Sequence, residues 1–196
     1  IPYVIIEKNA GVGGTWYENT YPGCRVDVGN HFYCYSFEPN PDWQEFFSRQ
    51  PELQRYFAST ARKYGVEARI RFNTEVQAAD FDEASGEWRV RVRAKDGAVE
   101  TLRARVLISG VGQLNRPKLP DIDGLDRFRG PAFHSACWDH SVSLAGKRVA
   151  VIGTGASGVQ VIQEMAKVAA HLTVFQRTPN WCAPLHNSPI DAESQR

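Results

Sequence analysis

The chain has 196 residues, of which 42% are hydrophobic and 23% charged, and its formal net charge is +1 from 23 basic and 22 acidic residues. This composition is ordinary for a globular protein of one large or two small domains. The near-zero charge argues against nucleic acid or an anionic membrane as a main partner, and no run reaches the roughly 18 apolar residues of a membrane span.

The first half of the chain predicts one helix among short strands and loops. Residues 3–7 indicate a buried strand, and residues 16–37, rich in aromatic residues, Gly and Pro, indicate an ordered loop. Residues 51–64 carry apolar side chains at helical spacing, with Pro51 in the first turn and Gly65 as a stop. Further strands are expected over residues 70–72, 75–80, 87–94, 98–104 and 106–109, with a hairpin turn at Asp96-Gly97.

The second half predicts a βαβ unit after a linker over residues 113–126. The unit consists of a strand over 148–152, a glycine-rich turn over 153–158, a helix over 156–169 and a strand over 172–176, and the tail from 190 is polar. We therefore expect an α/β fold of tandem Rossmann-like nucleotide-binding domains with an antiparallel β insert.

The strongest local motif is Gly153-Thr154-Gly155-Ala156-Ser157-Gly158, which follows an apolar strand and opens a helix. Its first glycine permits the tight turn, its second lets the backbone approach a pyrophosphate, and its third allows close packing of helix and strand. The motif in this setting predicts a dinucleotide site rather than an ordinary glycine-rich turn.

Residues at two strand ends predict which nucleotides bind. The strand after the motif ends at Gln176-Arg177-Thr178, where an NAD site would place a carboxylate. A guanidinium there favours the 2′-phosphate of NADP, unless Arg177 is only a solvated cation. Glu7 ends the first strand and suits the ribose of an unphosphorylated nucleotide, FAD or NAD, although alone it could be a solvated strand-end residue.

Four motifs in order resemble those of the Baeyer–Villiger monooxygenase family, whose members are flavin-dependent (class B) enzymes. They are Gly13-Gly14-Thr15-Trp16, Tyr21-Pro22-Gly23 with Asp27, the fingerprint Phe128-x-Gly130-x-x-x-His134-x-x-x-Trp138-Asp139, and Phe175-Gln176-Arg177-Thr178-Pro179. Trp138 favours this family over the related N- and S-oxygenating flavin monooxygenases. The overall sequence also resembles that of the aryl-ketone branch, such as 4-hydroxyacetophenone monooxygenase.

The resemblance implies that NADPH reduces FAD and that O2 then supplies one oxygen atom to a ketone or to a heteroatom. It implies that Glu7 holds the adenosine ribose of FAD and that Val76 lies at the adenine end. It implies that the flavin is lined by Thr15, Trp16, Tyr17 and Glu18, with Asp27 and Tyr33 close by. It implies that the nicotinamide is bordered by Arg25, Val26 and Asp27. It implies NADP contacts from Gly153, Thr154, Gly155, Ala156, Ser157, Gly158, Val159, Gln160, Arg177 and Thr178.

Asp27 is the candidate catalytic residue, because a carboxylate near a flavin can hold a cation that stabilises a developing anion. The alternative is a loop cap after the Pro-Gly turn. For His134 a hydrogen-bonded linker residue is the alternative to a role in coupling domains, and the tryptophans are expected to pack. Arg89, Arg91 and Arg93 indicate a solvated strand face.

Two other features bound the chemistry. Cys24, Cys34, Cys137 and Cys182 have no CxxC spacing, which predicts neither a disulfide framework nor a zinc site and suits a reducing cytoplasm. The histidines have no metal-ligand spacing, and no GxSxG elbow indicates a hydrolase.

The family pattern also predicts parts that this sequence does not contain: a first strand with its own GxGxxG, and a distal arginine. We therefore expect an internal piece, a third to two-fifths of an enzyme, that alone binds FAD poorly and turns over no substrate. Its expected parts are an FAD-binding domain over 1–116, a linker with the fingerprint over 117–146 and the start of an NADP-binding domain over 147–196. A non-catalytic nucleotide-binding fragment is the alternative of another class.

Overall fold

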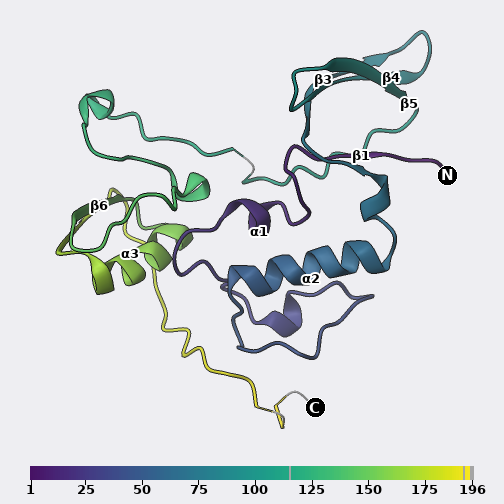
Figure 1. Cartoon of the computed structure of the whole chain (residues 1–196). Coiled ribbons are helices and arrows are strands. Elements are labelled where there is room, and N and C mark those ends of the chain that lie inside the picture. Colours follow the sequence, from purple (N-terminus) through teal and green to yellow (C-terminus); the bar gives the residue numbers. More distant parts are fainter. Residues whose placement is uncertain (115, 192, 195–196) are drawn as a thin grey trace. The chain divides into compact units, whose positions relative to one another are not determined.

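The computed structural model describes residues 1–114, 116–191 and 193–194. They form two compact units (Figure 1): Ile1–Tyr17 with Gln54–Asn115, and Glu18–Leu53 with Arg116–Arg196. We call these unit 1 and unit 2 and describe each by itself. The expected boundaries at 116 and 146 concern domains of a longer enzyme and stay a prediction.

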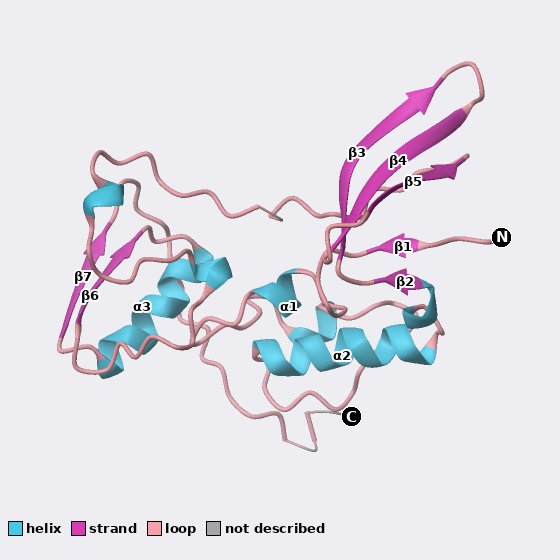
Figure 2. Ribbon diagram, turned by 45° about the horizontal axis from the view of Figure 1, so that its top comes forward, coloured by secondary structure: helices cyan, strands magenta, loops and turns pink. Residues whose placement is uncertain are grey.

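Unit 1 carries two small sheets (Figure 2). Strand β1 (Ile5–Ile6) pairs in parallel with β2 (Ile70–Arg71), while β3 (Thr74–Asp82), β4 (Glu87–Ala94) and β5 (Val99–Ala104) form an antiparallel sheet in that order. The antiparallel insert is thereby confirmed. A short 3-10 helix, η2 (Glu67–Arg69), leads into β2.

The alternation predicted for β4 is confirmed. Val90 and Val92 are buried, whereas the three arginines between and beside them are exposed. Arg89 forms an ion pair with Asp82, and Arg93 one with Glu75. These arginines line a solvated, charge-paired face.

Two predicted strands are wrong in part or in full. Of residues 3–7 only Ile5–Ile6 are strand, and Tyr3 is 51% exposed, because β1 has a single partner strand among the described residues. Residues 106–109 form no strand, and Ile108 is 86% exposed. An apolar run becomes a strand only where a neighbour accepts its backbone hydrogen bonds.

Helix α2 (Gln50–Lys63) confirms the predicted helix to within one residue at each end. Gly65 ends it with a φ of 66°, in the left-handed region where glycine has no Cβ penalty. The N–H of Val66 donates to the Ala61 carbonyl at 2.8 Å, and that of Gly65 donates to the Arg62 carbonyl at 3.0 Å. These two bonds satisfy carbonyls that the helix end would leave unpaired.

Unit 2 contains the predicted βαβ element. Strand β6 (Arg148–Ile152) pairs in parallel with β7 (His171–Phe175), and helix α3 (Ala156–Val168) connects them and buries Val161 and Met165. The segment predicted as an ordered loop holds short helical turns, α1 (Thr15–Glu18) and η1 (Asn30–Phe32). The linker and fingerprint carry η3 (Leu125–Arg127) and η4 (Ser135–Cys137). No helix in the described part of the chain is long and apolar enough to cross a bilayer.

Candidate functional site

The glycine-rich loop between β6 and α3 has three geometrically different glycines. Gly153 has a φ of 100°, which an L side chain rarely adopts. A Cβ on Gly158 would lie 2.5 Å from the Gly153 carbonyl oxygen, so the helix start packs directly on the turn. A Cβ on Gly155 would meet no atom within 4 Å. This open backbone at the start of a 13-residue helix fits an approaching pyrophosphate.

The end of β7 lies against this loop. The N–H of Gly153 donates to the Phe175 carbonyl at 2.8 Å, and Gln176 Nε2 donates to Thr154 Oγ1 at 2.7 Å. Arg177 follows directly, is exposed, and forms no ion pair with any residue that the structure describes. An exposed guanidinium beside a glycine loop fits a 2′-phosphate.

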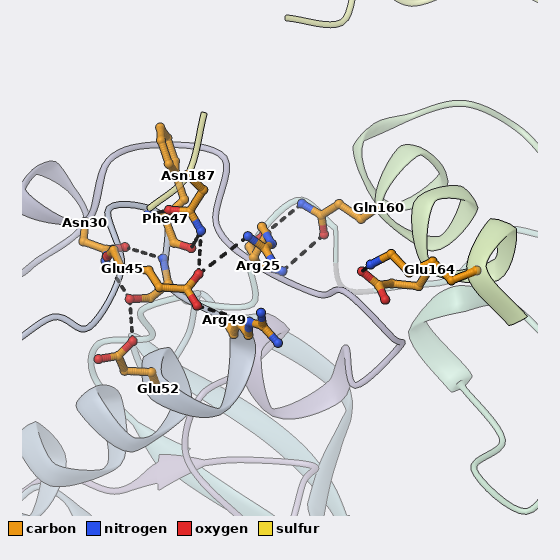
Figure 3. Close-up of polar contacts among 11 residues, drawn as sticks. Arg25, Asn30, Glu45, Phe47, Arg49, Glu52, Gln160, Glu164 and Asn187 are labelled. Carbon is orange, nitrogen blue, oxygen red and sulfur yellow. Dashed lines mark hydrogen bonds and ion pairs between the residues drawn. The ribbon is translucent and has the colours of Figure 1, made fainter. Parts of the chain in front are cut away.

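A second set of contacts joins α3 to residues 21–25, and Figure 3 shows the part that Arg25 makes. Gln160 Oε1 accepts hydrogen bonds from the Tyr21 hydroxyl at 3.0 Å and from the Arg25 N–H at 3.2 Å, and its Nε2 donates to the Arg25 carbonyl at 3.0 Å. Burial holds the pKa of the Tyr21 phenol well above its ordinary value, so the hydroxyl stays a donor. The Gln160 side chain, expected at the pyrophosphate, is instead occupied by this segment.

The Arg25 side chain is held from the other direction (Figure 3). Its guanidinium lies 3.7 Å from the Glu45 carboxylate, which also lies 3.5 Å from Arg49 Nε. Beside this pair the buried Asn30 side chain accepts from the Ser48 N–H at 2.9 Å and donates to Ser48 Oγ at 2.6 Å. Arg25 is thus fixed through both its backbone and its side chain.

The segment 44–47 is further tied to residues 187–190. Asn187 Oδ1 accepts from the Phe47 N–H at 3.0 Å, and the Ile190 N–H donates to the Gln44 carbonyl at 2.9 Å. Ile190, placed by sequence in an uninformative tail, is buried. Neither Glu45 nor Asn187 was singled out by sequence, because Glu45 meets Arg25 and Asn187 across 20 and 142 residues of chain.

Asp27 follows Val26, which is buried. Its side chain is exposed and forms neither a hydrogen bond nor an ion pair within the described residues. No side-chain hydrogen bond among the described residues supports the loop-cap alternative for Asp27. The carboxylate remains available to a cation.

Thr15, Trp16 and Tyr17 directly follow a tight backbone turn. Gly13 and Gly14 have φ values of 134° and 52°, and the Trp16 N–H donates to the Gly13 carbonyl at 2.9 Å. A Cβ on Gly11 would lie 2.6 Å from the Tyr17 ring. Trp16 is buried, in line with the packing role expected for it.

The other flavin candidates are spread over both units. Glu7 is half-buried at the end of β1, and its Oε1 accepts from the Asn9 N–H at 2.8 Å. Val76 is exposed, at the register shift of β3. Unit 1 holds Glu7, Thr15, Trp16, Tyr17 and Val76, while unit 2 holds Glu18, Arg25, Val26, Asp27 and Tyr33.

The fingerprint is organised by its aromatic residues. A Cβ on Gly130 would lie 2.8 Å from the Phe128 ring, so only glycine lets this ring lie so close. Trp138 packs edge-on against Phe133, with ring centroids 5.0 Å apart. Trp138 thus packs within the fingerprint, while Phe128 stays 62% exposed and contacts Gly130 with its ring.

His134 and Asp139 stabilise the backbone of the fingerprint. His134 Nδ1 accepts from the Ala136 N–H at 3.1 Å, which places its ring proton on Nε2. Hydrogen bonds from the Ser141 hydroxyl and N–H hold the pKa of the Asp139 carboxyl below its ordinary value. The linker interpretation of His134 accounts for these contacts.

Cys24 is expected to be the least reactive cysteine. It is buried, and this burial raises the pKa of its thiol from 9.0 to about 11, while exposed Cys137 and Cys182 keep access to solvent. The thiolate is the nucleophile, so alkylation of the folded full-length protein near pH 8, followed by peptide mapping, should label Cys24 last. Equal labelling of Cys24 and Cys137 would contradict this prediction.

The same shift predicts a loss of stability in alkali. The folded state binds the Cys24 proton more tightly than the unfolded state, so the free energy of unfolding falls as pH rises from about 9 towards 11. Cys24→Ala should flatten that part of the pH profile in urea unfolding.

Comparisons with known proteins show close similarity along nearly the whole chain. Residues 6–187 match the flavin-binding monooxygenase-like family. A Baeyer-Villiger monooxygenase of Pseudomonas aeruginosa is 43% identical over 194 residues, covering 99% of this chain and 36% of that protein. A 2-oxo-Delta(3)-4,5,5-trimethylcyclopentenylacetyl-CoA monooxygenase of Pseudomonas putida is 45% identical, with 96% and 36% covered.

Solved structures give the same result. OTEMO in complex with FAD and NADP matches with a TM-score of 0.90 and 44% identity, over 98% of this chain and 37% of that one. Cyclohexanone monooxygenase from Rhodococcus bound to NADP+ matches with a TM-score of 0.87 and 39% identity, over 98% and 36%. The chain thus spans about a third of the length of these relatives. No group of three or more His, Cys, Asp or Glu residues in the described ranges could hold a metal ion.

Proposed function

The chain belongs to the flavin-binding monooxygenase-like family, and we propose that the protein containing it is an FAD- and NADPH-dependent Baeyer–Villiger monooxygenase. The reaction converts a ketone, O2, NADPH and a proton into an ester or lactone, water and NADP+. The observation that carries this proposal is the glycine loop with its open Gly155 and the exposed Arg177 beside it. OTEMO, solved in complex with FAD and NADP, is 44% identical to this chain.

On this proposal the βαβ element holds NADP. The backbone N–H groups at the start of α3 face the pyrophosphate, and Gly155 lets it approach. Arg177 and Thr178 hold the 2′-phosphate, which an acidic residue at this position would repel. The proposed contact residues are Gly153, Thr154, Gly155, Ala156, Ser157, Gly158, Val159, Arg177 and Thr178, while Gln160 contributes its backbone and not its side chain, which is bonded to Tyr21 and Arg25.

FAD binds, on the same proposal, to a Rossmann-like domain of which unit 1 is part, so that the complete enzyme has two such domains in tandem. Glu7 holds the adenosine ribose, and the turn at Gly13-Gly14 brings Thr15 and Trp16 to the flavin. When bound and reduced, FAD supplies the electrons and activates O2. Asp27 then fixes a cation, supplied by an arginine outside this sequence, that stabilises the negative charge that develops.

The substrate is proposed to be a small-molecule ketone, free or attached to a carrier such as CoA, and an aryl ketone such as 4-hydroxyacetophenone is the finer proposal. Support for a ketone comes from the relatives named for cyclohexanone and for a cyclopentenylacetyl-CoA ketone. We also propose a reducing, cytoplasmic setting, because the four cysteines are all free.

Product analysis tests the proposal. The full-length protein, loaded with FAD, is given NADPH and air with cyclohexanone, 4-hydroxyacetophenone or a thioether, and products are identified by mass spectrometry. An ester or lactone that carries one atom of labelled O2 supports the proposal, and preference for the aryl ketone supports its finer part. Sulfoxide alone would favour an N- or S-oxygenating enzyme, and no NADPH consumption would favour a non-catalytic nucleotide-binding protein.

A further inference from the structure

One turn beyond the glycine loop, helix α3 also binds the Tyr21–Arg25 segment through Gln160. Gln160 follows Ser157 by three residues, so the two side chains lie on one face of the helix. Among the described residues, three hydrogen bonds of the Gln160 amide go to Tyr21 and Arg25, and Figure 3 shows the two that go to Arg25. We propose that Gln160 is a positioning residue that holds the segment Arg25–Asp27 at a fixed place relative to the glycine loop.

The backbone contact has the form of a peptide-like pair. Gln160 Oε1 accepts the Arg25 N–H while Nε2 donates to the Arg25 carbonyl, at 3.2 and 3.0 Å. A side-chain amide can satisfy both groups of one residue in this way, whereas neither a carboxylate nor an aliphatic side chain can. The two bonds therefore fix the orientation of the Arg25 backbone as well as its distance from α3.

Close packing leaves this segment little freedom to slide. Gly23 has a φ of 82°, and a Cβ on it would lie 2.8 Å from Glu164 Cγ and 3.1 Å from the Gln160 carbonyl oxygen. Glycine is thus required both for the turn and for contact with the helix. On the other side, Glu45 holds the Arg25 guanidinium.

The Tyr21 hydroxyl connects this contact to the start of the helix. It donates to Gln160 Oε1 at 3.0 Å and also interacts with Ser157, which belongs to the glycine motif itself. Tyr21 therefore links Ser157 of the glycine motif to Gln160. Neither motif predicts this link from the sequence, because Tyr21 and Gln160 are 139 residues apart.

The role rests on the proposed function, in which Arg25, Val26 and Asp27 border the nicotinamide. The residues assigned to the 2′-phosphate and pyrophosphate are untouched by the loss of Gln160 hydrogen bonds. We therefore expect the variant to bind NADP+ nearly normally but to hold the nicotinamide in a poorer position for hydride transfer, which depends steeply on geometry.

The test compares Gln160→Ala and Gln160→Met with Gln163→Ala, an exposed glutamine on the same helix, in the full-length protein. Gln160→Met keeps the side-chain length and removes all three hydrogen bonds, which guards against loss of folding by a cavity. Hydrogen exchange of the Arg25 amide, flavin reduction by saturating NADPH and the Kd for NADP+ are measured. Loss of the hydrogen bonds should raise the exchange rate of the Arg25 amide about tenfold and lower the rate of flavin reduction about tenfold. The Kd for NADP+ should change by less than about threefold.

Each result bears on one claim. Unchanged exchange at Arg25, or a normal reduction rate in both Gln160 variants, overturns the positioning role. A Kd that rises in parallel with the fall in rate also overturns it, because that pattern belongs to a nucleotide-contact residue. A wild-type protein that NADPH does not reduce overturns the proposed function instead, while exchange at Arg25 still shows whether Gln160 holds this segment.

Discussion

Replacing Arg177 by alanine is expected to weaken NADPH binding by about 10- to 100-fold, equivalent to about 1.5–3 kcal/mol for a lost hydrogen bond to a charged group. Binding of NADH should change little, because NADH has no 2′-phosphate to lose. Arg177 is exposed, has no ion-pair partner within the described ranges, and directly follows Gln176, which bonds to Thr154 of the glycine loop. Titration of the full-length protein with each nucleotide measures the two changes.

Arg148→Ala is the matched control for this prediction. Arg148 is also an exposed arginine of the βαβ element, but it begins β6 and so lies at the opposite end of the parallel pair from the end of β7. Its loss should weaken the binding of NADPH and NADH equally and only slightly. Equal losses for NADPH and NADH in Arg177→Ala would remove Arg177 from the 2′-phosphate.

The βαβ element was predictable because its signals are local. The strand over 148–152 is confirmed at both ends, and the helix and second strand begin or end within one residue of their predicted bounds. Three glycines at fixed spacing carry the turn, the open approach and the helix contact within six residues. Gly65 and Asp96-Gly97 likewise encode their turns locally.

The wrong strand predictions have a common physical cause: a local sequence pattern does not show which distant segment will lie beside a strand. Residues 3–7 and 106–109 are apolar and rich in β-formers, yet strand formation depends on which neighbour lies beside them. The loop over 16–37 was predicted to be ordered, but the residues that hold it are distant in sequence. Gln160 binds Arg25 from one side. From the other side Arg25 is held by Glu45, which Asn187 binds in turn. A local motif could reveal that Gly23 turns the chain, but not that it turns against α3.

Gly155 and Gly158 should respond to alanine in opposite ways, and this pair gives the sharpest test of the glycine loop. Gly158→Ala would place a methyl group 2.5 Å from the Gly153 carbonyl oxygen, a backbone atom that cannot turn aside. Alanine gains at most about 1 kcal/mol in helix propensity over glycine, which this overlap outweighs. We expect a net loss of about 1–3 kcal/mol in the free energy of unfolding, as for other overpacked sites.

Gly155→Ala should leave the protein without nucleotide as stable as before. Its backbone is extended, with φ −67° and ψ 177°, which any residue adopts, and the added methyl group meets no atom within 4 Å. The empty space in front of Gly155 is where the proposed pyrophosphate lies, so NADP+ should bind about 10- to 100-fold more weakly, a loss of about 1.5–3 kcal/mol. Urea unfolding and NADP+ titration of both variants separate the two effects. Normal NADP+ binding by Gly155→Ala would show that the nucleotide does not approach this loop, because no structural defect could account for that result.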